Sequence, residues 1–390
     1  MAHTLGRSAE VVVTPGNPGI PGSSAVSPEQ IEADLFVIGP EAPLVDGLAD
    51  RLRAAGRRVF GPGADGAILE GSKAWMKGLL VEAGVPTADH GTFIDRESAR
   101  AFLDRQQPPY VIKTDGLAAG KGVLVTESLD DARAAVDEYL SGSAFGDAGR
   151  TVVIEEGMVG PELSILAVCD GQRAVALAPA QDFKRIGDGD AGPNTGGMGA
   201  YSPVPLAPAT VVDDVMDRFV EPTLAALRGR SIDYRGVLYA GLMMTADGPR
   251  MLEYNIRFGD PECQVVVPRL TSDLAELLAQ AADGALRDTP SFSDQAMVGI
   301  VCASEGYPAS PRTGDPIAGL ADAQGMDDVV VFSAGVGLGD KGEQVTSGGR
   351  VLTVCATGRD IGAARERATE AVGKISWPGM YHRHDIAAGI

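Results

Sequence analysis

The stretch "YVIKTDGLAAGKGVLV", residues 110–125, constrains the fold most, because it places a glycine-rich loop between two strands. Its two ends are rich in β-branched and aromatic residues, which favour strands. A P-loop needs the pattern G-x-x-x-x-G-K-[ST] between a strand and a helix. Here Asp115 stands where the first Gly would be, and Gly122 rather than Ser or Thr follows Lys121. The stretch is therefore no P-loop: it is either an ordinary hairpin or a loop that covers phosphates with backbone N–H groups.

Composition and charge narrow the class of protein. The 390 residues carry a formal net charge of −20, which argues against nonspecific binding to nucleic acid or anionic membranes. There is no run of about 18 apolar residues to span a membrane, and "MAHTLGRSAE" lacks the apolar core of a signal peptide. The cysteines have no zinc or redox spacing, which favours buried thiols. We expect a cytoplasmic protein with no nucleic-acid or membrane partner.

Lysine is concentrated in one part of the chain. Of seven lysines, five lie between residues 73 and 184: Lys73, Lys77, Lys113, Lys121 and Lys184. The compact ammonium group of lysine suits a phosphate oxygen as a point charge. An anionic small substrate is therefore compatible with a chain that is acidic overall.

Residues 9–64 alternate apolar runs with turns, the pattern of a parallel α/β sheet. We expect strands at "AEVVV", "ADLFVIG" and "RRVFG", and a helix over "LVDGLADRLRAAG". The turns "TPGNPG" and "GPE" each follow a strand, so both would lie at the carboxyl edge of the sheet, where open α/β sheets bind ligands. The alternative is that they are only turns.

The rest of the chain mixes helices and strands. A helix is expected over "SKAWMKGLLVEAG", and residues 110–181 read as a compact α+β unit with the glycine loop at its tip, the shape of a lid. Ser128 with Asp131 is a plausible capping box for its helix. Residues 182–205 read as a long glycine-rich loop, and such loops are usually functional or disordered. Residues 295–390 are rich in strands before a last helix near "DIGAARERATEAVGKI".

The segment "MLEYNIRFGDPE", residues 251–262, carries the strongest chemical signal. Read as a strand, it places Glu253, Asn255 and Arg257 on one face. The other face is apolar and expected to be buried, and it holds Leu252, Tyr254 and Ile256. Carboxylate and amide oxygens suit Mg²⁺, and a guanidinium can grip a carboxylate or phosphate with two hydrogen bonds. The alternative is a solvated strand face with a chance Glu–Arg pair.

These features occur in a telling order: a strand lysine (Lys113), a glycine loop, an acidic strand end (Glu155 and Glu156) and a Glu-x-Asn strand. The order resembles the ATP-grasp ligases, in which two α+β subdomains clamp Mg-ATP. The segments "GPEAPLVDGLAD", "IKTDGLAAGKGV", "DFKRIGDGDAGPNTGGMGAYSP", "YNIRFGDPE" and "TSGGRVLTV" together are similar to those of the phosphoribosylamine–glycine ligases of purine synthesis. The similarity covers nearly the whole chain from about residue 5.

The resemblance implies an ATP-grasp fold of mixed α/β and α+β type with four parts. They are an N-terminal parallel α/β substrate domain (1–66) that lacks its first strand, a central ATP-grasp domain (67–109 and 182–292), a lid subdomain (110–181) and a β-rich C-terminal domain (293–390). It also implies a monomer.

The resemblance assigns residues to ATP, metal and substrates. ATP would be bound by Lys73, Lys113, Gly116, Gly120, Lys121, Gly122, Glu155, Glu156, Met158 and Glu162. Within that set, the lysines would contact phosphates, Glu155 and the Met158 backbone the adenine edge, and Glu162 the ribose. Mg²⁺ or Mn²⁺ would be held by Glu253 and Asn255. Glycine and phosphoribosylamine would lie against Gly16, Asn17, Gly39, Pro40, Glu41, Asp182, Lys184, Asn194, Gly196, Gly197, Met198, Arg257, Gly259 and Asp260, with Arg257, Lys113 and Asp182 catalytic.

The implied reaction joins glycine to phosphoribosylamine. A carboxylate is a poor electrophile, so glycine would first attack the γ-phosphoryl group of ATP to give glycyl phosphate. The amine of phosphoribosylamine would then form the amide, with ADP and phosphate as the other products. Two alternatives stay open: another ATP-grasp ligase or carboxylase, against which "GPNTGGMGAYSP" argues, and an ATP-binding protein without turnover.

The N-terminus departs from the family pattern. The family normally begins with a strand and a glycine-rich turn before its first helix, whereas "MAHTLGRSAEVVVTPGN" begins within that helix. About twenty residues would be absent, given the usual size of a strand plus turn. The turn would supply backbone donors at a helix N-terminus, a natural seat for phosphate. We expect a misplaced start rather than a lost sugar-phosphate site.

Overall fold

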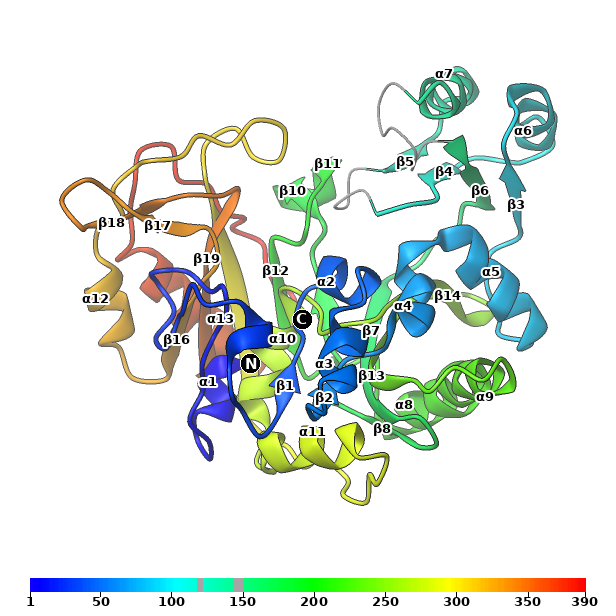
Figure 1. Ribbon diagram of the computed structural model, residues 1–390. Coiled ribbons are helices and arrows are strands. Elements are labelled where there is room, and N and C mark those ends of the chain that lie inside the picture. Colours follow the sequence, from blue (N-terminus) through cyan, green and yellow to red (C-terminus); the bar gives the residue numbers. More distant parts are fainter. Residues whose placement is uncertain (118–121, 143–149) are drawn as a thin grey trace.

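The computed structural model describes residues 1–117, 122–142 and 150–390. The fold is mixed α/β (Figure 1): a central sheet carries the N-terminal segment, a small sheet with two helices stands at one end, and a C-terminal sheet stands at the other. None of the described helices is long and apolar enough to cross a membrane. The predicted loop residues Gly120 and Lys121 lie outside the described residues.

The N-terminal segment contains the expected parallel strand pair. Its elements are α1 (Ala2–Leu5), η1 (Pro28–Gln30), β1 (Phe36–Val37), α2 (Glu41–Val45), α3 (Leu48–Ala54) and β2 (Val59–Phe60). The strand predicted at "AEVVV" is wrong, because only Val13 pairs there, in an isolated bridge with Ser23. An extended segment needs a neighbour to satisfy its backbone groups, and no described strand lies beside this one.

The central sheet is antiparallel in the order β14-β13-β7-β8. Its strands are β7 (Glu162–Asp170), β8 (Ala174–Ala176), β13 (Arg235–Thr245) and β14 (Gly248–Asn255). The nearby helical elements are α4 (Ala64–Gly71), α5 (Lys73–Glu82), α8 (Ala209–Val215), η4 (Met216–Val220) and α9 (Glu221–Gly229). Every residue of β7 after Glu162 is buried, since β7 pairs with β13 on one side and β8 on the other.

The small sheet (β3, β4, β5 and β6) carries the predicted glycine-loop hairpin. Its elements are β3 (His90–Phe93), α6 (Arg96–Leu103), β4 (Tyr110–Thr114), β5 (Val123–Thr126), α7 (Leu129–Leu140) and β6 (Val152–Glu156), with strand order β3-β6-β4-β5. Ser128 is the expected N-cap of α7, and its Oγ accepts a hydrogen bond from Asp131 N at 3.2 Å. The range 110–181 does not coincide with this sheet, because β3 joins it while the apolar β7 pairs with β13 instead.

The C-terminal sheet has the order β16-β19-β15-β12-β9. Its strands are β9 (Gln181–Asp182), β12 (Gly199–Ser202), β15 (Ala296–Ala303), β16 (Val329–Ser333) and β19 (Arg350–Gly358). The remaining elements of this half are α10 (Glu262–Val266), η5 (Val267–Arg269), α11 (Leu274–Ala282), α12 (Leu320–Gln324), β17 (Val336–Leu338), β18 (Gln344–Thr346) and α13 (Ile361–Val372). The predicted β-rich tail and last helix are confirmed.

Residues 182–205 are not a structureless loop. They contain the antiparallel pair β10 (Arg185–Gly187) and β11 (Ala191–Asn194), joined by the 3₁₀ turn η3 (Asp188–Asp190). Gly189 at φ +67° and Gly192 at φ +80° adopt left-handed backbone, which glycine allows without strain. This hairpin lies between the small sheet and the C-terminal sheet (Figure 1). The sequence did not predict this hairpin because its strands are only three and four residues long and lie in a glycine-rich segment.

Candidate active site

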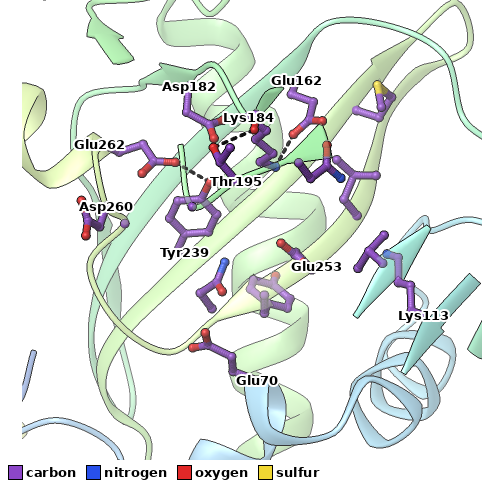
Figure 2. Close-up of a pocket in the computed structure, with 18 of the residues that line it drawn as sticks. Glu70, Lys113, Glu162, Asp182, Lys184, Thr195, Tyr239, Glu253, Asp260 and Glu262 are labelled. Atoms are coloured by element: carbon purple, nitrogen blue, oxygen red, sulfur yellow. Dashed lines mark hydrogen bonds and ion pairs between the residues drawn. The ribbon is translucent and has the colours of Figure 1, made fainter. Parts of the chain in front are cut away.

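A cavity of about 1000 Å³ lies where the N-terminal segment, the central sheet, the small sheet and the C-terminal half meet. Figure 2 shows Glu253 near its middle, Lys113 on one side, Tyr239 and Glu262 on the other, and Asp182, Lys184 and Glu162 along one edge. These side chains come from separate elements, so the fold rather than any single motif assembles the site.

On the small-sheet side, one buried carboxylate joins two lysines. Glu155 of β6 is 2% exposed and lies 3.0 Å from Lys113 Nζ and 3.1 Å from Lys77 Nζ. Burial alone would raise the pKa of Glu155, but the two ammonium groups hold it below its usual value. Burial lowers the pKa of Lys77 to about 8. The shared carboxylate fixes both ammonium groups, so Lys113 presents a positioned charge to the cavity.

The start of α5 positions a third lysine, Lys73. Asp115, just beyond β4, accepts hydrogen bonds from Ser72 Oγ at 3.0 Å and from Ala74 N at 2.7 Å. Lys73 Nζ donates to Gly116 O at 3.2 Å, and burial lowers the pKa of Lys73. Asp115 thus fastens the loop after β4 to the helix that carries Lys73.

Glu253 and Asn255 both line the cavity at the end of β14. Burial would raise the pKa of Glu253, but the charges of Lys184, Lys113 and Lys73 hold it below its usual value. Neither side chain has a hydrogen-bond or ion-pair partner among the described residues. Residues 1–117, 122–142 and 150–390 contain no cluster of three or more His, Cys, Asp or Glu that could hold a metal ion. A cation held here would therefore take its other ligands from phosphate and water.

The opposite face of β14 is only partly as predicted. Tyr254 and Ile256 are each 1% exposed, but Leu252 lines the cavity. In the ladder with β13, Gly241 pairs with Glu253 and Leu242 with Met251, so Leu252 is an extra residue at a β-bulge. A bulge re-aims the side chains around it, which simple alternation cannot anticipate.

Asp182 occupies the edge of the cavity formed by β9. Burial raises the pKa of its carboxyl to about 8, against the lowering effect of the Lys184 ammonium. Its buried Oδ1 has no hydrogen-bond partner among the described residues. Lys184 itself forms an ion pair with Glu162, and its carbonyl oxygen accepts from Thr195 N and Oγ1 at 2.8 Å (Figure 2). Asp182 is therefore a buried carboxyl group that lacks a donor.

Arg257 follows β14 and is held by two carboxylates. Its Nε donates to Glu41 at 2.9 Å and its Nη2 to Glu70 at 3.3 Å. Burial raises the pKa of Glu70 to about 7, although Arg257 acts in the opposite direction. The guanidinium is thus engaged by carboxylates on both sides.

The structure gathers most of the predicted residues around the cavity. The lining includes Gly39, Pro40, Glu41, Lys73, Lys113, Gly122, Glu155, Glu156, Met158, Glu162, Asp182, Lys184, Asn194, Gly196, Glu253, Asn255, Arg257, Gly259 and Asp260. Five predicted residues do not line it: Gly16, Asn17, Gly116, Gly197 and Met198. Asn17 Nδ2 instead donates to Ala334 O at 2.9 Å, and Met198 is fully buried in the core.

Sequence reasoning did not assign several polar residues to the site, among them Lys77, Glu70, Tyr239, Glu262 and Arg350. Tyr239 Oη donates to Glu262 Oε1 at 2.7 Å and pairs with Ser164 Oγ at 2.8 Å. Lys77 stands one helical turn after Lys73, a spacing that could have shown both on one side of α5. Glu262 and Arg350 lie inside the segments "MLEYNIRFGDPE" and "TSGGRVLTV", so the sequence offered a signal for both, whereas Glu70 and Tyr239 lie outside these segments.

Comparison with known proteins covers almost the whole chain. The families described as "Phosphoribosylglycinamide synthetase" match in three parts: the N domain over residues 1–70, the ATP-grasp (A) domain over 71–263 and the C domain over 297–389. The "Phosphoribosylamine--glycine ligase" of Rhizobium meliloti is 47% identical, covering 97% of this chain and 92% of the relative.

Solved structures agree with the sequence relatives. The crystal structure of phosphoribosylamine–glycine ligase from Thermotoga maritima has a TM-score of 0.87 and 34% identity, covering 98% of this chain and 95% of that one. The biotin carboxylase domain of a Hydrogenobacter thermophilus 2-oxoglutarate carboxylase, in complex with MgADP, shares the fold at a TM-score of 0.69 and 16% identity, covering 90% and 76%. With its N, A and C domains and its ATP-grasp fold, the chain belongs to the phosphoribosylamine–glycine ligase family.

Proposed function

We propose that the cavity around Glu253 performs the ligation that defines the family, the joining of glycine to phosphoribosylamine in purine biosynthesis with ATP as the energy source. One observation carries the assignment to these residues: the charges of Lys73, Lys113 and Lys184 converge on Glu253, which has no direct partner among the described residues. A free carboxylate ringed by cations suits a site that holds metal and phosphate together.

The donor set fits Mg-ATP. Glu253 and Asn255 offer hard oxygen ligands that have no competing partner in the described chain. They would hold Mg²⁺, or Mn²⁺, which also prefers oxygen ligands. The metal ion would neutralise charge on the phosphate groups. Lys73 and Lys113 would contact those phosphates.

The nucleotide base would lie beyond Lys113, toward Met158. Glu155 is committed to two lysines, so we assign it the placement of Lys113 rather than contact with adenine. The Met158 backbone then remains for the adenine edge and Glu162 for the ribose. Glu162 would have to exchange its ion pair with Lys184 for the ribose hydroxyls.

The acceptor end would bind the two other substrates. Asp182, with its unpartnered buried Oδ1, would receive the ammonium group of glycine. Arg257, with Glu41 and the turn at Gly39 and Pro40, would face phosphoribosylamine. Protonation or displacement of Glu70 would free one edge of the guanidinium for an anionic substrate.

The steps follow from these placements. The glycine carboxylate attacks the γ-phosphoryl group, where Lys113 and Lys73 stabilise the charge, and glycyl phosphate and ADP form. The amine nitrogen of phosphoribosylamine then bonds to the carbonyl carbon, phosphate leaves, and a proton is lost from the nitrogen. The small sheet would act as the lid that keeps water from the acyl phosphate. Because one chain supplies every residue used here, we propose a monomeric enzyme.

The test is ADP release from this chain with glycine and phosphoribosylamine present. Glu253→Gln, which keeps the side-chain shape but removes the charge, should reduce glycine-dependent ADP release by about a hundredfold or more. Glu97→Gln, an exposed change on α6, is the matched control and should behave as wild type. Near-normal turnover in Glu253→Gln would overturn the metal assignment. Tight ATP binding by wild type without glycine-dependent turnover would instead identify an ATP-binding protein.

A further inference from the structure

Arg350, the first residue of β19, reaches from the C-terminal sheet into the cavity. The ladder between β15 and β19 pairs Cys302 with Leu352 but Ala303 with Arg350, so a β-bulge lies at this strand end. Bulges turn a side chain away from its regular direction. The motif "TSGGRVLTV" therefore brings a C-terminal residue to the substrates' end of the site.

The guanidinium of Arg350 joins two separate segments of the cavity wall. Its Nη1 donates to Gly196 O at 2.7 Å and to Asp260 O at 2.9 Å, and its Nη2 donates to Asp260 Oδ2 at 2.9 Å. The first contact holds the 194–197 segment, and the other two hold the turn that follows Arg257. Both terminal nitrogens thus donate to protein acceptors, which supports a role for Arg350 in positioning the wall.

Gly196 is held from its other side as well. Its backbone N–H donates to the Tyr307 hydroxyl at 3.0 Å. Side chains of the C-terminal half therefore bind both the N–H and the carbonyl oxygen of Gly196. A Cβ atom on Gly196 would stand 2.8 Å from Arg350 Nη2 and 2.9 Å from its Cζ. A Cβ on Gly349 would stand 2.3 Å from the Tyr307 ring. Glycine at these two positions is what lets the guanidinium and the ring approach so closely.

We propose that Arg350 and Tyr307 clamp Gly196 and that Arg350 ties this segment to Asp260, so that the three residues form a clamp that positions the acceptor end of the active site. The inference rests on the proposed function, because the 194–197 segment and the 257–260 turn are the walls assigned there to glycine and phosphoribosylamine. It gives the C-terminal half a role in substrate affinity. The nucleotide end, on the small sheet, makes no contact with the clamp residues among the described interactions.

The experiment measures the loop and the kinetics of the same variants. In Arg350→Ala, backbone amides of residues 192–198 should exchange hydrogen for deuterium faster. The KM for glycine, phosphoribosylamine or both should rise by about tenfold to a hundredfold, because small displacements of positioning groups are that costly. The KM for ATP and the affinity for MgADP should stay unchanged. Tyr307→Phe should act in the same direction more weakly, since it removes one neutral hydrogen bond.

Matched variants guard against a general loss of stability. Arg312→Ala is the control, because Arg312 forms ion pairs with Glu305 and Asp315 in the same half of the chain but does not line the cavity. It should leave exchange at 192–198 and all three KM values as in wild type. If Arg350→Ala fails to fold, Arg350→Lys serves, since one ammonium cannot reach Gly196 and both Asp260 acceptors at once.

The outcomes separate the clamp from the proposed function. Unchanged exchange at 192–198 in Arg350→Ala would overturn the clamp, and so would an equal rise in the KM for ATP. Faster exchange with unchanged KM for glycine and phosphoribosylamine would show that the clamped segment does not position substrates. A wild-type chain without glycine-dependent ADP release would overturn the proposed function, and the exchange measurement would still decide the clamp.

Discussion

The two ends of the cavity have opposite electrostatic character. At the small-sheet end, Lys77 and Lys113 share a single buried carboxylate, Glu155, and Lys73 adds a third ammonium group nearby, so positive charge is in excess. At the other end carboxyl groups outnumber cations. The carboxyl groups are Glu41, Glu70, Glu162, Asp182, Asp190, Asp260 and Glu262, and the cations are Lys184, Arg185, Arg257 and Arg350. The first end suits phosphate and the second suits amines, and glycine and phosphoribosylamine each bring an amine. In the proposed function, this difference would place the nucleotide phosphates at the first end and the amino groups of glycine and phosphoribosylamine at the second.

The pKa values show the same contrast. The carboxyl at the lysine end, Glu155, is held below its usual pKa, whereas Asp182 and Glu70 are raised to about 8 and about 7. All three are buried, so the neighbouring charges decide the direction. The comparison teaches that neighbouring charges, and not burial alone, set the direction of the pKa shift of a carboxyl group in this cavity.

Removing charge from the lysine end should have the largest effect. Lys113→Met should lower kcat by about a hundredfold to a thousandfold, because it removes charge stabilisation at the γ-phosphoryl group and leaves Glu155 with only Lys77. The KM for ATP should rise and that for glycine should not. ADP release measured against each substrate checks this. Lys341→Met, an exposed change, is the control. If Lys113→Met left kcat and the KM for ATP unchanged, the assignment of nucleotide phosphate to the lysine end would be wrong.

A substitution at the opposite end should reverse the pattern. Asp182→Asn keeps the shape of the side chain but removes the charge that would meet the glycine ammonium, a loss of about 1.5–3 kcal/mol for a charged hydrogen bond. The KM for glycine should therefore rise by about tenfold to a hundredfold, while MgADP affinity measured by calorimetry stays constant. If nucleotide affinity fell as much as glycine affinity, the two ends would not act separately.

The smallest effect concerns stability. The pKa of Glu70 is raised from 4.5 to about 7 on folding, so the folded state keeps a proton that the unfolded state loses. Its contribution to the free energy of unfolding is full below about pH 4.5 and is lost as the pH rises through about 7. Urea unfolding of wild type and Glu70→Gln should therefore diverge between pH 5 and 8, by at most about 3 kcal/mol and in favour of the variant at high pH. Glu366→Gln, exposed on α13, should show no such divergence.

Local patterns predicted what local forces determine. The hairpin of β4 and β5, helix α5 with its Ser72 cap, the parallel β1–β2 pair and four buried cysteines all follow from short-range propensity or composition. The same reasoning failed where a distant neighbour decides. The "AEVVV" run has no neighbouring strand in the described part of the chain, and β7 pairs with β13 in the central sheet and not with the small sheet.

The candidate site divides in the same way. Glu253 and Asn255 stand out in sequence because they share a strand face two residues apart. The roles of the partner residues do not stand out: the structure shows them through the contacts of Lys77 with Glu155, of Glu70 with Arg257 and of Arg350 with Gly196. Each of these contacts joins residues that the fold, not the sequence, makes neighbours. Asn17 shows the opposite. Its turn motif predicted a place in the site, but its side chain donates to Ala334 O and does not line the cavity.

Strand β12 has a consequence for how this enzyme can be divided. It leaves the segment that carries Asp182 and Lys184 and then becomes an interior strand of the C-terminal sheet, paired with β15 on one side and β9 on the other. A gene fragment that stops before β15 would therefore leave the backbone N–H and C=O groups on that edge of β12 unpaired, close to the cavity. Unpaired strand edges promote aggregation. The C-terminal half therefore cannot be removed without disrupting a shared sheet. Split or domain-exchanged versions of the enzyme should be cut at a position that does not separate β12 from β15.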